Sequence, residues 1–241
     1  MGTLYIVSTP IGNLEDITIR AIKILFSVDF IACEDTRKTS FLLHQLQKKF
    51  TSLLYGNDLK PANKPILISY YDEVEFKKAT EIVDLLTEGR NVALVTDSGT
   101  PLISDPGFKL VSECYNRNIK VMSIPGPSSV LSALIISGLP TNQFIFLGYL
   151  PPKKSKRIKI LTDLNLFFYK SLHLKPTVII FESPHRLKEC LNAIKEIFGD
   201  IEIVIVRELT KIHEEVWRGK ISNCPVTLKG EMVLLFNIPP R

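Results

Sequence analysis

A short apolar run that leads into a loop of small residues constrains the fold of this chain more than any other segment. Residues 92–95, Val-Ala-Leu-Val, are followed by Asp97-Ser-Gly-Thr-Pro-Leu-Ile-Ser-Asp-Pro-Gly107. In open α/β sheets, ligands bind where such loops leave the carboxyl ends of the strands. Small residues let the backbone approach a ligand closely, and prolines restrict the path of the loop. The segment therefore predicts a buried strand that ends in a ligand-binding loop.

The same design occurs twice more in the first half of the chain. Residues 4–7 lead into Ser8-Thr-Pro-Ile-Gly-Asn13, and residues 119–124 lead into Pro125-Gly-Pro-Ser-Ser129. One such loop alone would be an ordinary turn. Three of them on separate strands favour a pocket that recognises its ligand largely through backbone groups.

Strand-like and helix-like segments alternate through the first 140 residues. The predicted strands are 4–7, 29–32, 66–69, 92–95 and 119–124, and the predicted helices are 16–28, 36–46, 73–88, 108–116 and 128–137. This alternation predicts a mostly parallel sheet that is covered on both faces. The polar stretch 47–65 contains Gly and Pro, and we interpret it as a long irregular excursion.

The second half alternates less strictly, which favours a sheet with antiparallel pairing. Its predicted elements are strands 177–181, 202–206 and 232–238 and helix 187–198. The prolines between residues 139 and 152 indicate a domain boundary. We therefore predict an N-terminal α/β domain, 1–140, that carries the three ligand-binding loops, and a C-terminal α/β domain, 141–241; the family resemblance described below implies that the second domain closes a cofactor cleft.

Composition excludes several classes of protein. With 45% hydrophobic and 23% charged residues, the chain is expected to fold rather than to stay disordered, and its formal charge of +5 permits a polyanionic partner. The four cysteines and four histidines are dispersed, which predicts reduced thiols and no metal site. Without a signal-like start or an apolar run of about 20 residues, we expect a soluble, cytoplasmic protein that does not contact membranes. A P-loop, a GxGxxG fingerprint and a serine nucleophile elbow are all missing.

Charged motifs follow several of the predicted strands. They are Glu34-Asp-Thr-Arg37, Glu182-Ser-Pro-His-Arg186, Arg207-Glu-Leu-Thr-Lys211 and Lys229-Gly-Glu231. An ordinary helix start explains Asp35, Ser183 and Pro184. It does not explain Arg37, Glu182 or Arg186, which are candidates for a cleft, and a structural network of ion pairs is the alternative.

Five basic side chains occur within Lys153-Lys-Ser-Lys-Arg-Ile-Lys159. They predict either the solvated start of a helix or an arm that contacts phosphates.

Together with Thr96 and Gly148-Tyr-Leu-Pro151, these motifs resemble the tetrapyrrole-methylase (class III) superfamily of S-adenosylmethionine-dependent methyltransferases. Within it they are similar to the branch of bacterial enzymes that 2′-O-methylate a cytidine in the decoding region of small-subunit (16S) ribosomal RNA. The resemblance spans nearly the whole chain. It implies two α/β domains of the tetrapyrrole-methylase type, with a mostly parallel sheet in the first and a mixed sheet in the second. It also implies S-adenosyl-L-methionine between them, a homodimer, and 16S rRNA within the small ribosomal subunit as partner.

Carried over position by position, the resemblance implies the cofactor contacts, and the methyl-transfer reaction that it implies suggests two further sets of site residues. Cofactor contacts fall on Pro10, Ser98, Gly99, Thr100, Ile103, Ser128, Ser129 and Glu182. Candidates for assisting proton removal from the ribose hydroxyl are Glu182, Glu208, Lys211 and Glu231. RNA contacts are expected from Asp35, Arg37, Lys153, Lys154, Lys156, Arg157 and Arg186.

The sequence departs from the superfamily at two kinds of position. Ser98 and Ser129 stand where alanine is common, and we expect both small residues to be tolerated. Many relatives continue with a helical tail after the position of Lys229-Gly-Glu231, so we expect the core to act without ribosome contacts from such a tail. Two other functions stay open: methylation of a small tetrapyrrole on the same scaffold, and a non-catalytic ribosome-associated binding protein.

Overall fold

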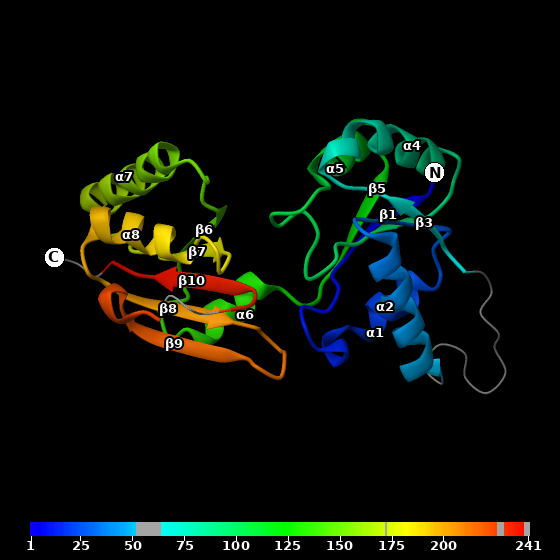
Figure 1. The fold of residues 1–241 in the computed structure, drawn as a ribbon. Helices are drawn as coiled ribbons and strands as arrows, with labels where there is room; N and C mark the ends of the chain where they lie inside the picture. The colour runs from blue at the N-terminus through cyan, green and yellow to red at the C-terminus, as the bar shows by residue number, and fades with distance from the viewer. Residues whose placement is uncertain (52–63, 172, 226–228, 239–241) are drawn as a thin grey trace. The chain divides into compact units, whose positions relative to one another are not determined.

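The structure is a computed structural model that describes residues 1–51, 64–171, 173–225 and 229–238. The chain forms two compact units, Met1–Ser128 and Ser129–Arg241 (Figure 1). This division falls before helix α6 (Ser129–Ile136), whereas the predicted boundary of 140/141 falls after it. Most of the excursion predicted at 47–65 lies outside the described residues. Within the described part of the chain, no helix is long and apolar enough to cross a membrane.

The first unit contains a five-stranded sheet with the order β3-β2-β4-β1-β5, in which every pair of neighbours is parallel. Its strands are β1 (Thr3–Val7), β2 (Phe30–Cys33), β3 (Ile66–Ser69), β4 (Val92–Leu94) and β5 (Lys120–Ile124). Because all five strands run the same way, their carboxyl ends share one edge of the sheet. The predicted parallel sheet is confirmed.

Helices cover both faces of this sheet. They are α1 (Ile19–Leu25), α2 (Thr36–Lys49), α4 (Glu75–Thr87) and α5 (Phe108–Asn116). One apolar core joins the sheet to α4 and α5, and a second core joins the opposite face to α1 and α2. Helix α1 is shorter than the predicted 16–28 because the Thr18 side chain accepts a hydrogen bond from the Ala21 amide and begins the helix there.

The second unit contains a mixed five-stranded sheet with the order β6-β7-β10-β8-β9. Its strands are β6 (Phe144–Tyr149), β7 (Thr177–Glu182), β8 (Glu202–Arg207), β9 (Glu215–Lys220) and β10 (Met232–Phe236). Strands β6 and β7 are parallel, and the other pairs are antiparallel. Helices α7 (Lys154–Lys170) and α8 (Leu187–Phe198) pack on the sheet around one apolar core, and Figure 1 shows both on the same side. The predicted mixed sheet is confirmed.

Two strands of this sheet, β6 and β9, were not predicted. Strand β6 lies inside the proline-containing stretch that we interpreted as a boundary. Strand β9 lies at the sheet edge, and its sequence Glu-Val-Trp-Arg-Gly-Lys alternates half-buried with exposed side chains. An edge strand needs little apolar character, so its sequence pattern is weak.

Glu75 of α4 fixes the loop that follows β4. Its carboxylate oxygen Oε1 accepts hydrogen bonds from the amides of Gly107 at 3.0 Å and Lys109 at 3.3 Å, and from the Tyr70 hydroxyl at 3.1 Å. Gly107 is the N-cap of α5 and has no side chain to cap that helix. The buried carboxylate therefore caps α5 from a neighbouring helix and holds one end of the β4 loop.

We predict that Glu75→Ala lowers the free energy of unfolding by about 2–3 kcal/mol, because three donors lose a charged acceptor. Glu73→Ala removes an exposed carboxylate from the preceding turn and should change stability by less than about 0.5 kcal/mol. Urea unfolding monitored by circular dichroism measures both. Equal stability of the two variants would contradict the capping role.

Candidate functional site

Three loops meet at the carboxyl edge of the first sheet. The Thr9 amide donates to the Gly99 carbonyl at 2.8 Å, and the Gly99 amide donates to the Thr9 carbonyl at 3.2 Å. The Thr100 hydroxyl lies 3.1 Å from the Ser8 hydroxyl and donates to the Pro127 carbonyl at 2.9 Å. The loops after β1, β4 and β5 are thus joined by direct hydrogen bonds, as the sequence predicts for three neighbouring strand ends.

The backbone of the β4 loop is strained at several places. Gly99 has φ +88°, and a Cβ added there would lie 3.2 Å from an Ile11 methyl group. Leu102 and Ser104 have φ of +71° and +67°, which side chains rarely adopt. Strain of this kind is concentrated at ligand-binding and active sites, and it costs about 1–3 kcal/mol per residue.

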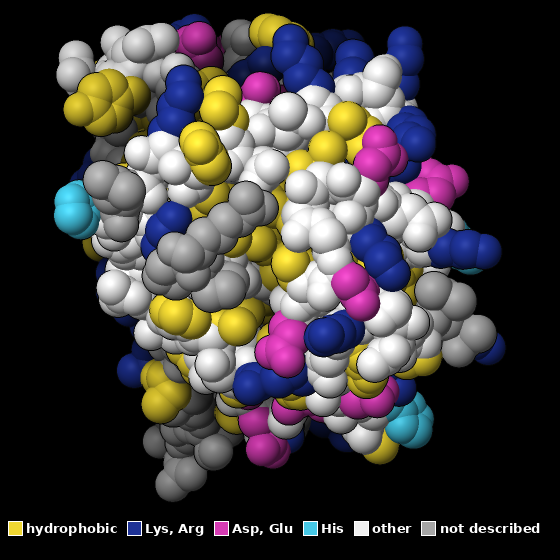
Figure 2. Space-filling model, turned by 90° about the vertical axis from the view of Figure 1, so that its left-hand side faces the viewer, with side chains coloured by type: hydrophobic (Ala, Val, Ile, Leu, Met, Phe, Trp, Pro, Cys, Tyr) yellow, Lys and Arg dark blue, Asp and Glu magenta, His cyan; other side chains and the backbone are white. Residues whose placement is uncertain are grey.

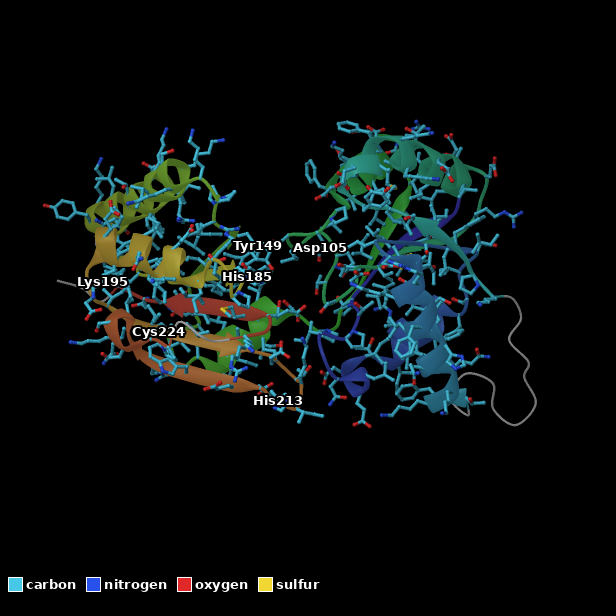
Figure 3. All side chains as sticks on the ribbon, in the orientation of Figure 1. Asp105, Tyr149, His185, Lys195, His213 and Cys224 are labelled. Carbon is cyan, nitrogen blue, oxygen red and sulfur yellow. The ribbon has the colours of Figure 1, made fainter. Side chains whose placement is uncertain are left out.

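Carboxylates also follow the strands at this edge of the sheet. Glu34 accepts a hydrogen bond from the Thr96 hydroxyl, and Asp97 pairs with Lys38 at 2.7 Å. Burial, together with the negative charge of Glu34, raises the pKa of Asp105 to about 6. Figure 3 labels Asp105 in the loop after β4. The sequence analysis did not single out Asp105 as a site residue, although its place after a buried strand was a usable signal.

Asp35 and Arg37, predicted to contact RNA, pair with each other at the start of α2. Asp35 caps the helix by accepting from the Arg37 amide at 2.8 Å, and the Arg37 guanidinium lies 2.8 Å from the same carboxylate. These bonds from Arg37 hold the pKa of Asp35 well below its usual range. The Arg37 side chain is 90% exposed, so its outer face is accessible to a partner.

The predicted cofactor residues fall into two groups. Those in the first unit belong to the three joined loops or follow them directly: Pro10, Ser98, Gly99, Thr100, Ile103 and Ser128. Ser98 and Ile103 are exposed, and Pro10 and Ser128 are half-buried. Ser129, which begins α6, and Glu182, which ends β7, belong to the second unit. The cofactor role of all these residues stays a prediction.

Three of the four predicted catalytic residues form one cluster in the second unit. The Lys211 ammonium donates to Glu208 at 3.2 Å and to Glu231 at 2.8 Å, and the Glu231 amide donates to the Glu208 carboxylate at 3.0 Å. Glu208 lies at the end of β8, and Glu231 lies directly before β10, its neighbour in the sheet. The charged motifs after β8 and before β10 therefore make one site.

The cluster has a strained backbone and shifted ionisation. Glu208 and Thr210 have φ of +51° and +62°, and a Cβ on Gly230 would collide with the Glu208 carboxylate. Burial alone raises the pKa of Glu208, but the Glu231 amide and the Lys211 ammonium more than offset it and leave the pKa lowered. Burial alone lowers the pKa of Lys211, and its two carboxylate partners reverse this and leave it raised. Lys211 is thus a cation at neutral pH.

Glu182, the fourth predicted catalytic residue, is separate from this cluster. Its side chain is fully buried, accepts from the Ser183 amide at 2.8 Å and lies 3.7 Å from the Arg186 guanidinium. Its second oxygen, Oε2, has no hydrogen-bond partner among the described residues. A buried carboxylate oxygen without a partner marks a place where a ligand or water supplies a donor.

The basic segment at the start of α7 divides into two parts. Lys153, Lys154 and Lys156 are exposed, as a phosphate-contacting arm requires. The Arg157 side chain is only 3% exposed, and its guanidinium donates to Glu189 at 3.2 Å. The assignment of Arg157 to this arm is corrected, because Arg157 shares the inward face of α7 with Leu161, Leu164 and Phe168.

Arg186, also predicted to contact RNA, donates to the Leu150 carbonyl and is half-buried beside Glu182.

Figure 2 shows acidic side chains interspersed with basic ones over the face that it draws. That face therefore has no single sign of charge, and attraction of a polyanion depends on local groups such as the three lysines.

Several curated proteins that are similar to this chain share one name. A protein of Thermotoga maritima named ribosomal RNA small subunit methyltransferase I is 48% identical over 223 residues, which cover 92% of this chain and 90% of that protein. A protein of the same name from a Hydrogenobaculum species is 43% identical and covers 97% of this chain and 95% of its own length.

Solved structures with the same fold include uroporphyrin-III C-methyltransferase of Thermus thermophilus in complex with S-adenyl homocysteine. It superposes with a TM-score of 0.60 at 15% sequence identity, and the match covers 97% of both chains. The family model for tetrapyrrole (corrin/porphyrin) methylases matches residues 3–225. This chain belongs to the tetrapyrrole (corrin/porphyrin) methylase family.

Proposed function

We propose that the protein transfers a methyl group from S-adenosyl-L-methionine to the 2′-hydroxyl of a cytidine ribose in the decoding region of 16S ribosomal RNA. The structural observation that carries the proposal is the meeting of the β1, β4 and β5 loops through Thr9, Gly99, Thr100 and Pro127. The names of relatives that are 43% and 48% identical over nearly the whole chain support ribosomal RNA as the substrate.

The three loops suit a cofactor that carries both charged and polar groups. Exposed Ser98 and half-buried Thr100 place hydroxyls at the edge where open α/β sheets bind ligands, and the Thr9–Gly99 hydrogen bonds hold their loop there. In the second unit, the unpartnered oxygen of Glu182 would accept a hydrogen bond from a ligand donor. When bound, S-adenosylmethionine supplies an electrophilic methyl group on its sulfonium, and the residues named here hold and orient it.

The cluster of the second unit suits ionisation of a ribose hydroxyl. Lys211 is cationic and would stabilise negative charge as it develops on the attacking oxygen. Glu208 already accepts from Lys211 and from the Glu231 amide, so it positions the ammonium. The Glu231 side chain is 72% exposed and is the carboxylate best able to receive the proton.

Binding of the RNA follows from the exposed cations. Lys153, Lys154 and Lys156 would contact phosphates, and Arg37 would add a contact from the first unit. We propose that the substrate is the RNA within the small ribosomal subunit, in the cytoplasm, and that the protein acts as a homodimer.

The proposal is tested by incubating the protein with methyl-labelled S-adenosylmethionine and small subunits from a strain that lacks this activity, then mapping the label by nuclease digestion and mass spectrometry. Label on the ribose of one cytidine is the expected result. Label on a base, or transfer to a uroporphyrinoid and not to RNA, would overturn it.

We predict that Gly99→Ala weakens S-adenosylmethionine binding about tenfold or more, equivalent to about 1.4 kcal/mol, because the added Cβ would press on the Ile11 methyl group 3.2 Å away and shift the joined loops. Gly89→Ala is the matched control, since Gly89 has φ +91° but open space around it. Both variants carry the same kind of backbone strain. Titration calorimetry measures the affinity, and equal losses in the two variants would exclude a local effect.

We predict that Lys211→Ala lowers kcat about 100- to 1000-fold and leaves cofactor affinity unchanged, because a fixed cation near the developing charge is lost. Lys211→Arg keeps the charge and should retain more activity. Lys195→Ala, which removes an exposed lysine of α8 paired with Asp200, should match the unmodified protein. Full activity of Lys211→Ala in single-turnover assays would reject the assignment.

We predict that combined replacement of Lys153, Lys154 and Lys156 by Ala weakens RNA binding and reduces the slope of log affinity against log salt by about 2–3, corresponding to three phosphate contacts. Filter binding between low and moderate salt gives the slope. Lys195→Ala with Lys220→Ala, both exposed, should leave it unchanged. An unaltered slope in the triple variant would show that the lysines do not touch phosphates.

A further inference from the structure

The last residue of β6, Tyr149, presents an aromatic side chain to solvent. Tyr149 is 55% exposed, although the residue after it, Leu150, is buried. Its ring packs edge-on against Phe181 of β7, with centroids 5.6 Å apart, and Phe181 in turn packs against Phe146 at 4.8 Å. Tyr149 is therefore the outermost ring of an aromatic row that holds its orientation.

The backbone around Tyr149 is held by two arginines. The Leu150 carbonyl accepts from Arg186, and the Pro151 carbonyl accepts from Arg157 at 3.5 Å. Gly148 has φ +61°, and it lies within an irregularity in the β6–β7 pairing between Phe146 and Tyr149. The two arginines thus bond to the backbone directly after Tyr149, and the strand pairing with Phe181 holds Tyr149 itself.

The surroundings of Tyr149 are polar and basic. Lys153, Lys154 and Lys156, all exposed, follow it within a few residues along the chain. The exposed His185 comes from the loop after β7, and because β6 and β7 are parallel, Tyr149 and His185 lie beyond the same edge of the sheet (Figure 3).

We propose that Tyr149 is a substrate-positioning residue, whose ring stacks on an unpaired base of the RNA while the neighbouring lysines hold the adjacent phosphates. This inference rests on the proposed function. Single-stranded RNA is commonly recognised by bases stacked on aromatic rings next to a positively charged surface. A ring that is exposed, braced and followed by three lysines meets both requirements. It would fix the nucleotide so that its ribose hydroxyl is presented for transfer.

The test compares Tyr149→Ala with Tyr149→Phe and Tyr149→Trp, using small subunits that the unmodified protein methylates. We expect Tyr149→Ala to raise KM for the subunits roughly 5- to 100-fold, in the range found for one base stacked on an aromatic ring. The Phe and Trp variants keep the ring and should stay within about threefold of the original KM. Tyr169→Ala is the matched control, because Tyr169 is 77% exposed at the far end of α7.

Two further measurements separate stacking from other roles. Cofactor affinity and the salt slope of RNA binding should both be unchanged in Tyr149→Ala, because no charge is lost. An unchanged KM in Tyr149→Ala, an equal loss in Tyr149→Phe, or a weakened cofactor affinity would overturn the inference. If the unmodified protein methylates no RNA at all, the proposed function fails and the inference fails with it. If the unmodified protein is active, only the variants decide the inference.

Discussion

The antiparallel pair of hydrogen bonds between Thr9 and Gly99 is the contact on which the site of the first unit depends. It joins loops that leave two neighbouring strands, β1 and β4, and Thr100 extends the link to Pro127 after β5. Such a bridge forms only because the parallel sheet brings these strand ends to one edge. The buried Glu75 carboxylate holds the other end of the β4 loop at Gly107. A strained loop fixed at both ends can present its backbone to a ligand without first paying to become ordered.

The candidate site of the second unit is built from charged side chains, whereas that of the first unit is built mainly from hydrogen-bonded loop backbone. Lys211 is held by Glu208 and Glu231, and the close packing of Gly230 against the Glu208 carboxylate leaves no room for a side chain. The proposed division of labour follows from this difference. Methyl transfer needs two groups held in line and a site that favours a deprotonated oxygen. Under the proposed function, the loops of the first unit would hold the cofactor, and Lys211 of the second unit would favour the deprotonated oxygen.

The sequence predicted the first unit well because its signals are local. Apolar strands, amphipathic helices and small-residue loops can each be recognised from a pattern within about ten residues. The alternation of strands and helices then predicts that the strands are parallel. Strand β9 was not predicted because an edge strand with an exposed Val216 has no apolar run in its sequence. Arg157 was misassigned because a run of basic residues was taken as one surface. The spacing of Arg157 with Leu161, Leu164 and Phe168 on a single helix face already indicated that it points inward. The cluster of Glu208, Lys211 and Glu231 depends on long-range strand pairing, which the motifs alone could not fix.

Whether the joined loops of the first unit hold the cofactor is tested most directly by a crystal structure of the protein with S-adenosylhomocysteine. We expect ligand density against Gly99, Thr100 and the residues after Pro127, with the Thr9–Gly99 bonds intact. Ligand bound elsewhere, with these loops untouched, would contradict it.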